Sequence, residues 1–135
     1  MITGRETFHK SERLCSRKII ALLFDSGNTF YSPLFKVLWQ KTVLKTTFPA
    51  QIAFSVPKKG FRGAVTRNLL KRRMKEAYRK NKHILYDYLI PEKIQIAVIV
   101  IFRGKVVTDY LTIEKTIVEM LDNLTNLIRE NKKKC

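Results

Sequence analysis

The chain has few of the residues that build metal centres, disulfide frameworks or catalytic triads, with two cysteines and two histidines among 135 residues. Two cysteines are too few for a disulfide framework or a metal site. His9 and His83 are isolated, and the carboxylates do not gather as paired-carboxylate or two-metal chemistry requires. No glycine-rich phosphate loop of the Walker or dinucleotide type is present. The sequence therefore predicts no catalytic centre in the protein itself.

Long apolar runs are missing too. The longest, Ile96–Phe102, is far below the roughly 20 residues that a membrane-spanning helix needs, and it is typical of a buried strand. The first 13 residues contain no hydrophobic segment of the secretory type. Cys15 and Cys135 are interpreted as two unrelated thiols in a reducing compartment. We therefore expect a cytoplasmic protein without a membrane partner.

Acidic residues are scarce, and this scarcity is the strongest signal in the composition. Eleven Asp and Glu stand against 27 Lys and Arg, which gives a formal net charge of +16. Such an excess predicts a polyanionic partner, with nucleic acid ahead of an anionic membrane. The hydrophobic share of 45% and the length of 135 residues predict a single folded domain over residues 1–135.

Much of the charge lies in residues 58–82, which hold eleven Lys or Arg and one acid, Glu76. From Ala64 onward this stretch has no Gly or Pro and is rich in good helix formers. A solvated helix face would interleave acids at i,i+4, so a basic ridge that meets an anionic partner is the better interpretation. At about 100° per residue, the other side of this single amphipathic helix is apolar, with Leu70, Met74, Ala77, Tyr78 and Leu85.

The order of residues in this stretch resembles the RNR motif of the bacterial ribonuclease P protein subunit. In that family, a strand ending in Ser-Val-x-Lys-Lys leads through a glycine-bearing loop into a helix that begins Ala-Val-x-Arg-Asn. Here residues 55–59 match the strand end and residues 64–68 match the helix entry. The resemblance covers most of the chain. Two positions depart from the pattern, because Leu69 stands where Arg is typical and the loop 58–63 is slightly longer than usual.

The resemblance implies a function carried out together with RNA. Ribonuclease P protein subunits bind the catalytic RNA subunit and the 5′ leader of precursor tRNA, and they assist endonucleolytic removal of that leader. The RNA performs the hydrolysis with Mg²⁺, so we expect no cofactor on the protein alone and no requirement for a protein oligomer. A ribosomal or ribosome-assembly RNA-binding protein is the alternative. A helix-turn-helix module that binds DNA agrees less well, because strands precede the basic helix.

Hydrophobic periodicity predicts a mixed order of helices and strands, typical of a small α+β two-layer sandwich with a mixed sheet of about four strands. The resemblance adds a fold like domain 2 of ribosomal protein S5, with a left-handed βαβ crossover around the basic helix. Residues 1–13 are expected to form a basic arm and residues 131–135 a disordered tail. The first predicted element is a helix capped by Ser16 that runs to about Asp25 and is stopped by Gly27. A hairpin of strands 35–41 and 51–56 and the basic helix follow. A strand at 94–102 and a helix at 112–130 complete the order, with a short extra strand near Phe30.

Two sets of residues are candidates for RNA contact. The basic helix should anchor the catalytic RNA through backbone phosphates, with Arg67, Asn68, Lys71, Arg72, Lys75 and Arg79. The resemblance places the leader in a cleft beside the first helix, where Phe24 precedes Gly27. From helical phase alone Phe24 could equally close the core beneath that helix, and both interpretations stay open. The cleft candidates are Ile20, Phe24, Lys36, Leu38, Ser55, Lys58 and Lys59.

Overall fold

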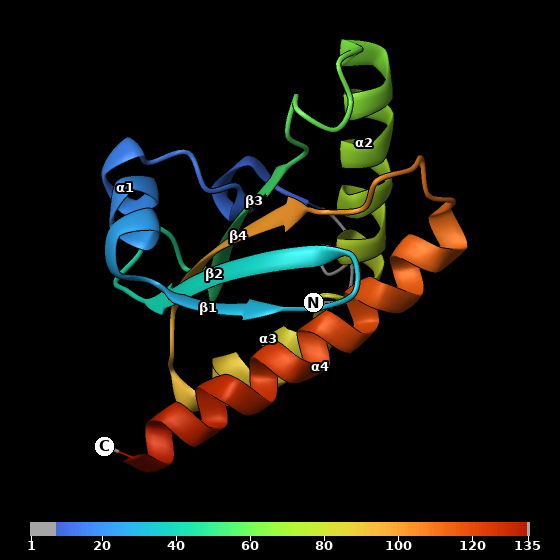
Figure 1. Cartoon of the computed structure of the whole chain (residues 1–135). Coiled ribbons are helices and arrows are strands. Elements are labelled where there is room, and N and C mark those ends of the chain that lie inside the picture. The colour runs from blue at the N-terminus through green and yellow to red at the C-terminus, as the bar shows by residue number, and fades with distance from the viewer. Residues whose placement is uncertain (1–7, 135) are drawn as a thin grey trace.

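Four α-helices, a short 3-10 helix and one four-stranded sheet make up residues 8–134, the part of the chain that this computed structural model describes (Figure 1). In chain order the elements are η1 (Lys10–Glu12), α1 (Arg17–Ser26), β1 (Asn28–Tyr31), β2 (Phe35–Lys41), β3 (Ala50–Ser55), α2 (Ala64–Asn81), α3 (His83–Glu92), β4 (Ile96–Phe102) and α4 (Tyr110–Lys134).

The sheet is mixed and has the strand order β1-β2-β4-β3. β1 and β2 form an antiparallel hairpin, β4 lies antiparallel to β2, and β3 lies parallel to β4. The expected α+β sandwich is therefore confirmed, including the short strand at Phe30. The predicted hairpin between strands 35–41 and 51–56 is wrong, because β4 lies between them. A strand that is apolar on both faces, as β4 is, belongs in the middle of a sheet.

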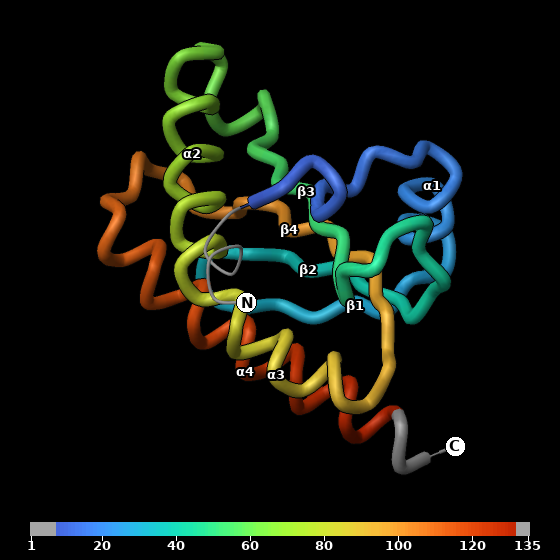
Figure 2. The backbone as a smooth tube through the Cα atoms, turned by 180° about the vertical axis from the view of Figure 1, so that it is seen from behind, coloured from blue at the N-terminus to red at the C-terminus, as the bar shows by residue number. Residues whose placement is uncertain are grey.

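One face of the sheet is closed by α2, α3 and α4, and the main core lies there (Figures 1 and 2). Alternate residues along each strand point into this core, as the period of two in a strand requires. The predicted apolar stripe of the last helix packs against them and is confirmed. The strands contribute Phe35, Val37, Trp39, Ile52, Phe54, Ile96, Val98, Val100 and Phe102, and α4 contributes Ile113, Ile117, Met120, Leu121, Leu124 and Ile128.

The predicted basic helix is divided in two. α2 ends at Asn81 and α3 begins at His83, although the sequence predicted one helix through Leu85 and then a turn at Pro91. Pro91 instead lies inside the last turn of α3. Lys82, at the break, is only 2% exposed. A helical pattern that counts Lys82 among the exposed cations cannot show that the chain turns there.

A buried carboxylate explains why Lys82 points inward. Oε2 of Glu12, which is 0% exposed, accepts hydrogen bonds from Nζ of Lys82 at 2.6 Å and from the hydroxyl of Tyr86. Oε1 of Glu12 accepts from the backbone N–H of His9 at 2.9 Å. Burial, more than the nearby charges, raises the pKa of Tyr86, so its hydroxyl remains a donor. A salt bridge therefore joins the start of the described chain to the α2–α3 junction.

Both ends of the described chain differ from expectation. Residues 8–14 are packed on the edge of β3, where the backbone N–H of Leu14 donates to O of Ile52 at 3.0 Å. This corrects the expected arm over 1–13, of which residues 1–7 lie outside the described part. At the other end α4 continues to Lys134, where a disordered tail was expected from residue 131.

Candidate nucleic-acid interface

α1 covers only part of the second face of the sheet. It begins at the N-cap Ser16, whose Oγ accepts from the N–H of Ile19 at 3.3 Å, and it buries Leu23 against β2 and β4. It stops at Gly27, where a Cβ would lie 2.6 Å from O of Leu23, so a side chain there would clash. The predicted cap at Ser16 and stop at Gly27 are confirmed, and the helix ends at Ser26, one residue after the predicted Asp25. Beneath it lies a second, smaller core of Leu14, Leu23, Leu38, Ala97 and Ile99.

Beyond α1, one residue from each strand forms a row across the sheet. Tyr31 is paired with Lys36, Lys36 with Ile101, and Ile101 with Ser55. These four residues face away from the main core, because their neighbours along each strand point into it. We call Tyr31, Lys36, Ile101 and Ser55 the open row. It brings two of the predicted cleft residues, Lys36 and Ser55, onto one surface.

Two exposed aromatic rings are candidates for base stacking, Tyr31 within the open row and Phe24 on α1. Phe24 is 61% exposed and Tyr31 is 59% exposed. Phe24 is therefore not a core residue, which removes one of the two interpretations left open above. Ile20 lies one turn earlier on the same flank of α1 and is half-buried against the smaller core. A ring with one face in water offers a nucleotide base a place to stack.

Leu38 is a correction to the predicted cleft. It is only 4% exposed and belongs to the core beneath α1. Its position on the correct face of β2 suggested the cleft, but the helix lies directly over that part of the strand. Leu38 therefore supports α1 and has almost no surface to offer a ligand.

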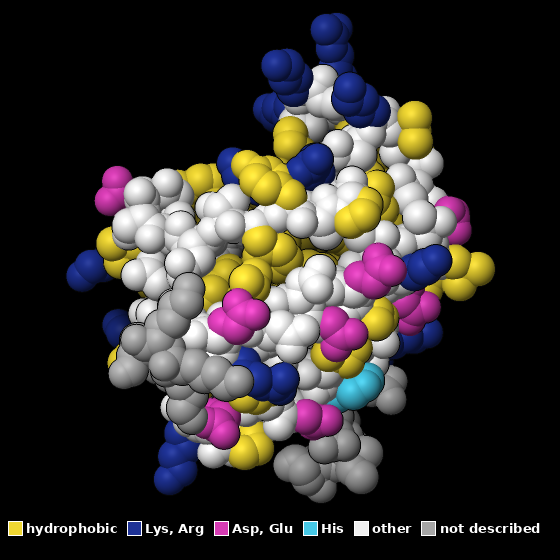
Figure 3. Space-filling model, turned by 60° about the horizontal axis from the view of Figure 1, so that its bottom comes forward, with side chains coloured by type: hydrophobic (Ala, Val, Ile, Leu, Met, Phe, Trp, Pro, Cys, Tyr) yellow, Lys and Arg dark blue, Asp and Glu magenta, His cyan; other side chains and the backbone are white. Residues whose placement is uncertain are grey.

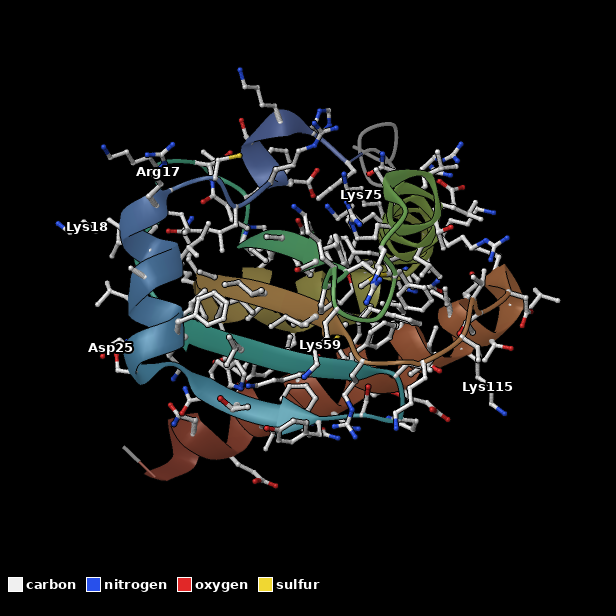
Figure 4. The ribbon with its side chains drawn as sticks, turned by 45° about the horizontal axis from the view of Figure 1, so that its top comes forward. Arg17, Lys18, Asp25, Lys59, Lys75 and Lys115 are labelled. Carbon is white, nitrogen blue, oxygen red and sulfur yellow. The ribbon has the colours of Figure 1, made fainter. Side chains whose placement is uncertain are left out.

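The loop 57–63 carries Lys58 and Lys59 and is held at its far end. The ring of Phe61 packs on Phe102 with 5.9 Å between centroids. Nη1 of Arg67 donates to O of Phe61 at 2.8 Å and to O of Arg62 at 2.7 Å. Figure 4 shows Lys59 over the sheet, between α1 and α2. The loop thus presents two exposed ammonium groups near the β3 end of the open row.

The α2 ridge consists of the outward side chains Asn68, Arg72 and Lys75, which are exposed and recur at helical spacing. Lys71 is half-buried beside them. These four were predicted to contact RNA, and the structure places them on one continuous surface. Leu69, where the family pattern has Arg, is half-buried and lies outside both core clusters.

Two further predicted cations on α2 already have protein partners. Arg67 holds the loop, as described above. Nη2 of Arg79 lies 2.7 Å from Oε2 of Glu76, and this hydrogen bond, ahead of the nearby cations, lowers the pKa of the Glu76 carboxyl. The contribution of Arg79 to an anion-binding surface is thus partly cancelled. Arg73, which was not predicted, donates from Nη1 to O of Thr108 at 2.6 Å and so ties the loop before α4 to α2.

Charge is separated between the surfaces of the molecule. Figure 3 shows Asp and Glu side chains spread over the face formed by α3 and α4, whereas Lys and Arg gather at the end of the molecule formed by α2. Acids on α3 and α4 include Asp87, Glu114, Glu119 and Asp122. A polyanion would therefore meet the α2 end and the open row, and it would be repelled from the α3–α4 face.

Two residues of this interface were not predicted from the sequence. The guanidinium of Arg103, just after β4, lies 4.9 Å from the centroid of the Tyr31 ring. The alternation of β1 could have placed Tyr31 on the same face as Lys36, had the β1–β2 pairing been predicted. No local signal marks Arg103, because its contact depends on how β4 is placed in the sheet.

The described residues contain no group of three or more His, Cys, Asp or Glu side chains placed to hold a metal ion. Within the same residues, no helix is both long enough and apolar enough to cross a membrane. What the geometry offers is a basic helix, a basic loop and an open sheet surface with exposed rings, which is a surface for binding a flexible anionic chain.

Known proteins share this sequence and fold. A family model described as Ribonuclease P matches residues 8–125. The ribonuclease P protein component of Chlorobium phaeobacteroides is 37% identical over 128 residues, covering 87% of this chain and 88% of the relative. That of Porphyromonas gingivalis is 34% identical over 122 residues, covering 89% of each.

Solved structures agree with the sequence comparison. The RNase P protein from Thermotoga maritima is similar with a TM-score of 0.66 at 26% identity, covering 83% of this chain and 96% of that one. The RNase P protein of Staphylococcus aureus is similar with a TM-score of 0.67, covering 85% of this chain and 96% of that one. Its identity is 22%, so this second likeness concerns the fold alone.

Proposed function

The chain belongs to the ribonuclease P protein family, and on that premise we propose that it is the protein component of a ribonucleoprotein endoribonuclease that removes the 5′ leader from precursor tRNA. In this proposal one chain, acting in the cytoplasm, binds two RNAs at once. The α2 ridge binds the catalytic RNA subunit, and the surface beside α1 binds the leader.

The observation that carries the proposal is the open row, which contains the exposed Tyr31, together with the exposed Phe24 on α1. A duplex hides the faces of its bases, whereas a single strand can lay them on aromatic rings. Lys36 within the row, Lys59 over the sheet (Figure 4) and Lys58, its exposed neighbour in the chain, would meet the phosphates between bases. Such contacts fix the position of a strand without reading its sequence, so the leader preference should be weak.

The α2 ridge suits a folded RNA. Asn68, Arg72 and Lys75 project from a rigid helix and can contact successive backbone phosphates. Arg67 and Phe61 fix the loop relative to this helix. A catalytic RNA docked on the ridge would therefore be held at a defined distance from a leader in the open row. This is how the protein would bring the scissile bond toward the reacting groups of the RNA.

Hydrolysis is assigned to the RNA subunit and the Mg²⁺ that it holds. The cations of the protein would reduce repulsion between the two RNA chains, which also strengthens the binding of metal ions at their junction. The protein side chains in this proposal bind and position, and none of them transfers a proton or attacks phosphorus.

The proposal is tested by reconstitution. Protein freed of RNA should not cleave precursor tRNA, the catalytic RNA alone should cleave slowly at low Mg²⁺, and the two together should cleave fast under the same conditions. Arg72→Ala with Lys75→Ala should reduce this stimulation, whereas Lys93→Ala with Lys115→Ala, which removes two exposed cations elsewhere, should not. Cleavage by RNA-free protein would contradict the proposal.

A second experiment separates the proposal from ribosome assembly. The protein is purified from cells under conditions that preserve RNA binding, and the bound RNA is sequenced. One abundant structured RNA that supports precursor tRNA cleavage is the expected result. Recovery of ribosomal RNA instead would favour a ribosomal or ribosome-assembly protein.

A further inference from the structure

A second basic hollow lies on the opposite flank of α1 from Phe24. It has a volume of about 650 Å³ and is enclosed by the η1 segment, the start of α1, the loop after β2 and the start of β3. We call it the α1 pocket. Its cations come from three different segments of the chain, and its described lining residues include no Asp or Glu. They are Lys10, Arg13, Lys18 and Lys45.

These charges are not neutralised by the protein. Among the described residues none of the four forms a salt bridge, and the closest partner of Arg13 is the ring of Phe8, 5.5 Å from the guanidinium carbon. The acid on α1 is Asp25, which Figure 4 shows at the other end of the helix from Arg17 and Lys18. Cations that converge on a hollow without acids repel one another and raise the positive potential there. An anion bound in the hollow would reduce this repulsion.

The pocket is more than a site for a phosphate. Ile19, Leu22 and Val43 also line it, and Leu22 and Val43 are 45% and 89% exposed. An inorganic anion or the backbone of a duplex would leave this apolar surface in water. An unpaired nucleotide presents both a phosphate and the face of a base, so it matches the cations and the apolar wall together.

The α1 pocket and the open row are connected along β3. Gln51 lines the pocket and Ser55 lies in the open row, and both point to the same side of this strand. They are four positions apart in the strand, a distance of about 13 Å that a few nucleotides cover. Between them on the same face, Ala53 packs against the smaller core beside Leu14, whose backbone N–H donates to O of Ile52. A strand that leaves the open row at the β3 edge would pass over this packed segment before it reaches the pocket.

We propose that the α1 pocket binds the upstream part of the same leader whose downstream part lies on the open row. This inference rests on the proposed function and extends it to a second leader site. The leader crosses the N-terminal end of α1, and Lys18 and Lys45 contact phosphates on the far side. Affinity for precursor tRNA then rises in two steps as the leader grows, first when the open row is filled and again when the pocket is reached.

The test compares leader lengths in the reconstituted holoenzyme. The affinity for precursor tRNAs with a series of leader lengths is measured with three holoenzymes. The first carries the wild-type protein, the second the pocket variant Lys18→Ala with Lys45→Ala, and the third the control variant Lys105→Ala with Lys115→Ala. The pocket variant should lose about tenfold in affinity near 0.1 M salt for the longest leader, and its salt slope should fall by about 1.4 for two lost single-strand phosphate contacts. The control should lose nothing. All substituted lysines are exposed, so melting curves should stay unchanged.

The outcomes separate this inference from the proposed function. A loss that is equal for long leaders, short leaders and mature tRNA would place the pocket on another RNA and overturn the inference. An unchanged affinity for every leader would also overturn it. Phe24→Ala serves as the internal reference, because it should weaken binding of short and long leaders alike. If Phe24→Ala has no effect on leader binding, the open row fails as a leader site, whatever the pocket variant does.

Cys15 offers a direct readout, since it is exposed and lines the pocket. The chain has two cysteines, so Cys15 is the remaining thiol in a Cys135→Ser variant. An iron chelate attached to this thiol would cleave nearby RNA by hydroxyl radicals. In the holoenzyme with a long-leader substrate, cleavage should fall in the leader, upstream of the nucleotides protected by the open row. Cleavage confined to the catalytic RNA or to the tRNA body would overturn the inference.

Discussion

The two faces of the sheet are built from the same four strands and are used differently. On the face toward α2, α3 and α4, Phe35 and Phe102 are 0% and 1% exposed. On the other face, Tyr31 is 59% exposed, and Phe24 on α1, the helix that covers part of this face, is 61% exposed. The buried rings stabilise the fold. The exposed rings leave apolar surface for a ligand, and Lys36 on the same face adds a positive charge. Substitutions on the two faces should therefore separate stability from RNA binding.

The largest effect is expected on the closed face. Phe102 packs against Phe35 and Phe61, with ring centroids 6.2 and 5.9 Å away. Phe102→Ala should cost about 3–5 kcal/mol of unfolding free energy, because it leaves a cavity in the main core. Tyr31→Ala, an aromatic truncation on the open face, should cost about 0.5 kcal/mol or less. Urea unfolding of both variants measures the difference, and equal losses would contradict the distinction between the faces.

The salt bridge between Glu12 and Lys82 belongs to the closed side and should give the next largest effect. Glu12→Gln removes the carboxylate charge that faces the buried ammonium of Lys82 at 2.6 Å, which should cost about 3 kcal/mol. Glu12→Gln combined with Lys82→Met removes both charges and should recover much of that loss. Urea unfolding tests both variants. If the double variant is as unstable as the single one, the loss comes from packing rather than from the broken Glu12–Lys82 ion pair.

Much of the fold could be predicted from local patterns. The period of two in 35–41 gives the correct faces of β2, and the cap at Ser16 and the stop at Gly27 give the correct α1. The α2–α3 break could not be predicted, because it depends on Glu12, 70 residues before Lys82 in the sequence. The strand order could not be predicted either, since pairing of β2 with β4 depends on contacts distant in sequence.

The same limit explains the errors at the candidate site. The family resemblance, and not helical phase, singled out Phe24, whereas strand phase placed Lys36 on the face away from the main core. Leu38 has the correct phase too, but α1 covers it, and phase alone cannot show which part of a face a helix covers. Arg67 has the spacing of a phosphate contact, yet its guanidinium also binds two loop carbonyls. Periodicity predicts direction, and only the packed structure shows which surfaces remain open.

The α2 ridge gives a smaller and more general effect. Arg72→Ala should weaken binding of the catalytic RNA about fivefold near 0.1 M salt and lower the salt slope by about one unit or less. The loss should be the same with every precursor tRNA, because phosphate contacts carry no sequence information. Lys115→Ala, on α4, is the matched control and should change neither quantity. A loss that depends on the leader would place Arg72 at the leader site instead.

Leu69→Arg should have the smallest effect on stability. Leu69 is half-buried and lies outside both core clusters, so the change should alter unfolding free energy by about 0.5 kcal/mol or less. Binding of the catalytic RNA should stay the same or become tighter, because one cation is added beside the α2 ridge. Thermal melting and a salt titration of RNA binding measure the two effects. Unfolding of the variant would show that Leu69 is needed for packing.

The most direct measurement uses Phe24→Ala in the reconstituted holoenzyme. The affinity ratio between precursor and mature tRNA and the melting curve of the protein are recorded on the same preparation. We expect the ratio to fall by a factor that corresponds to about 1–3 kcal/mol, the value of stacking one base on an aromatic ring, while the melting curve stays unchanged. A melting temperature that drops sharply with an unchanged ratio would contradict the assignment of Phe24 to the leader site.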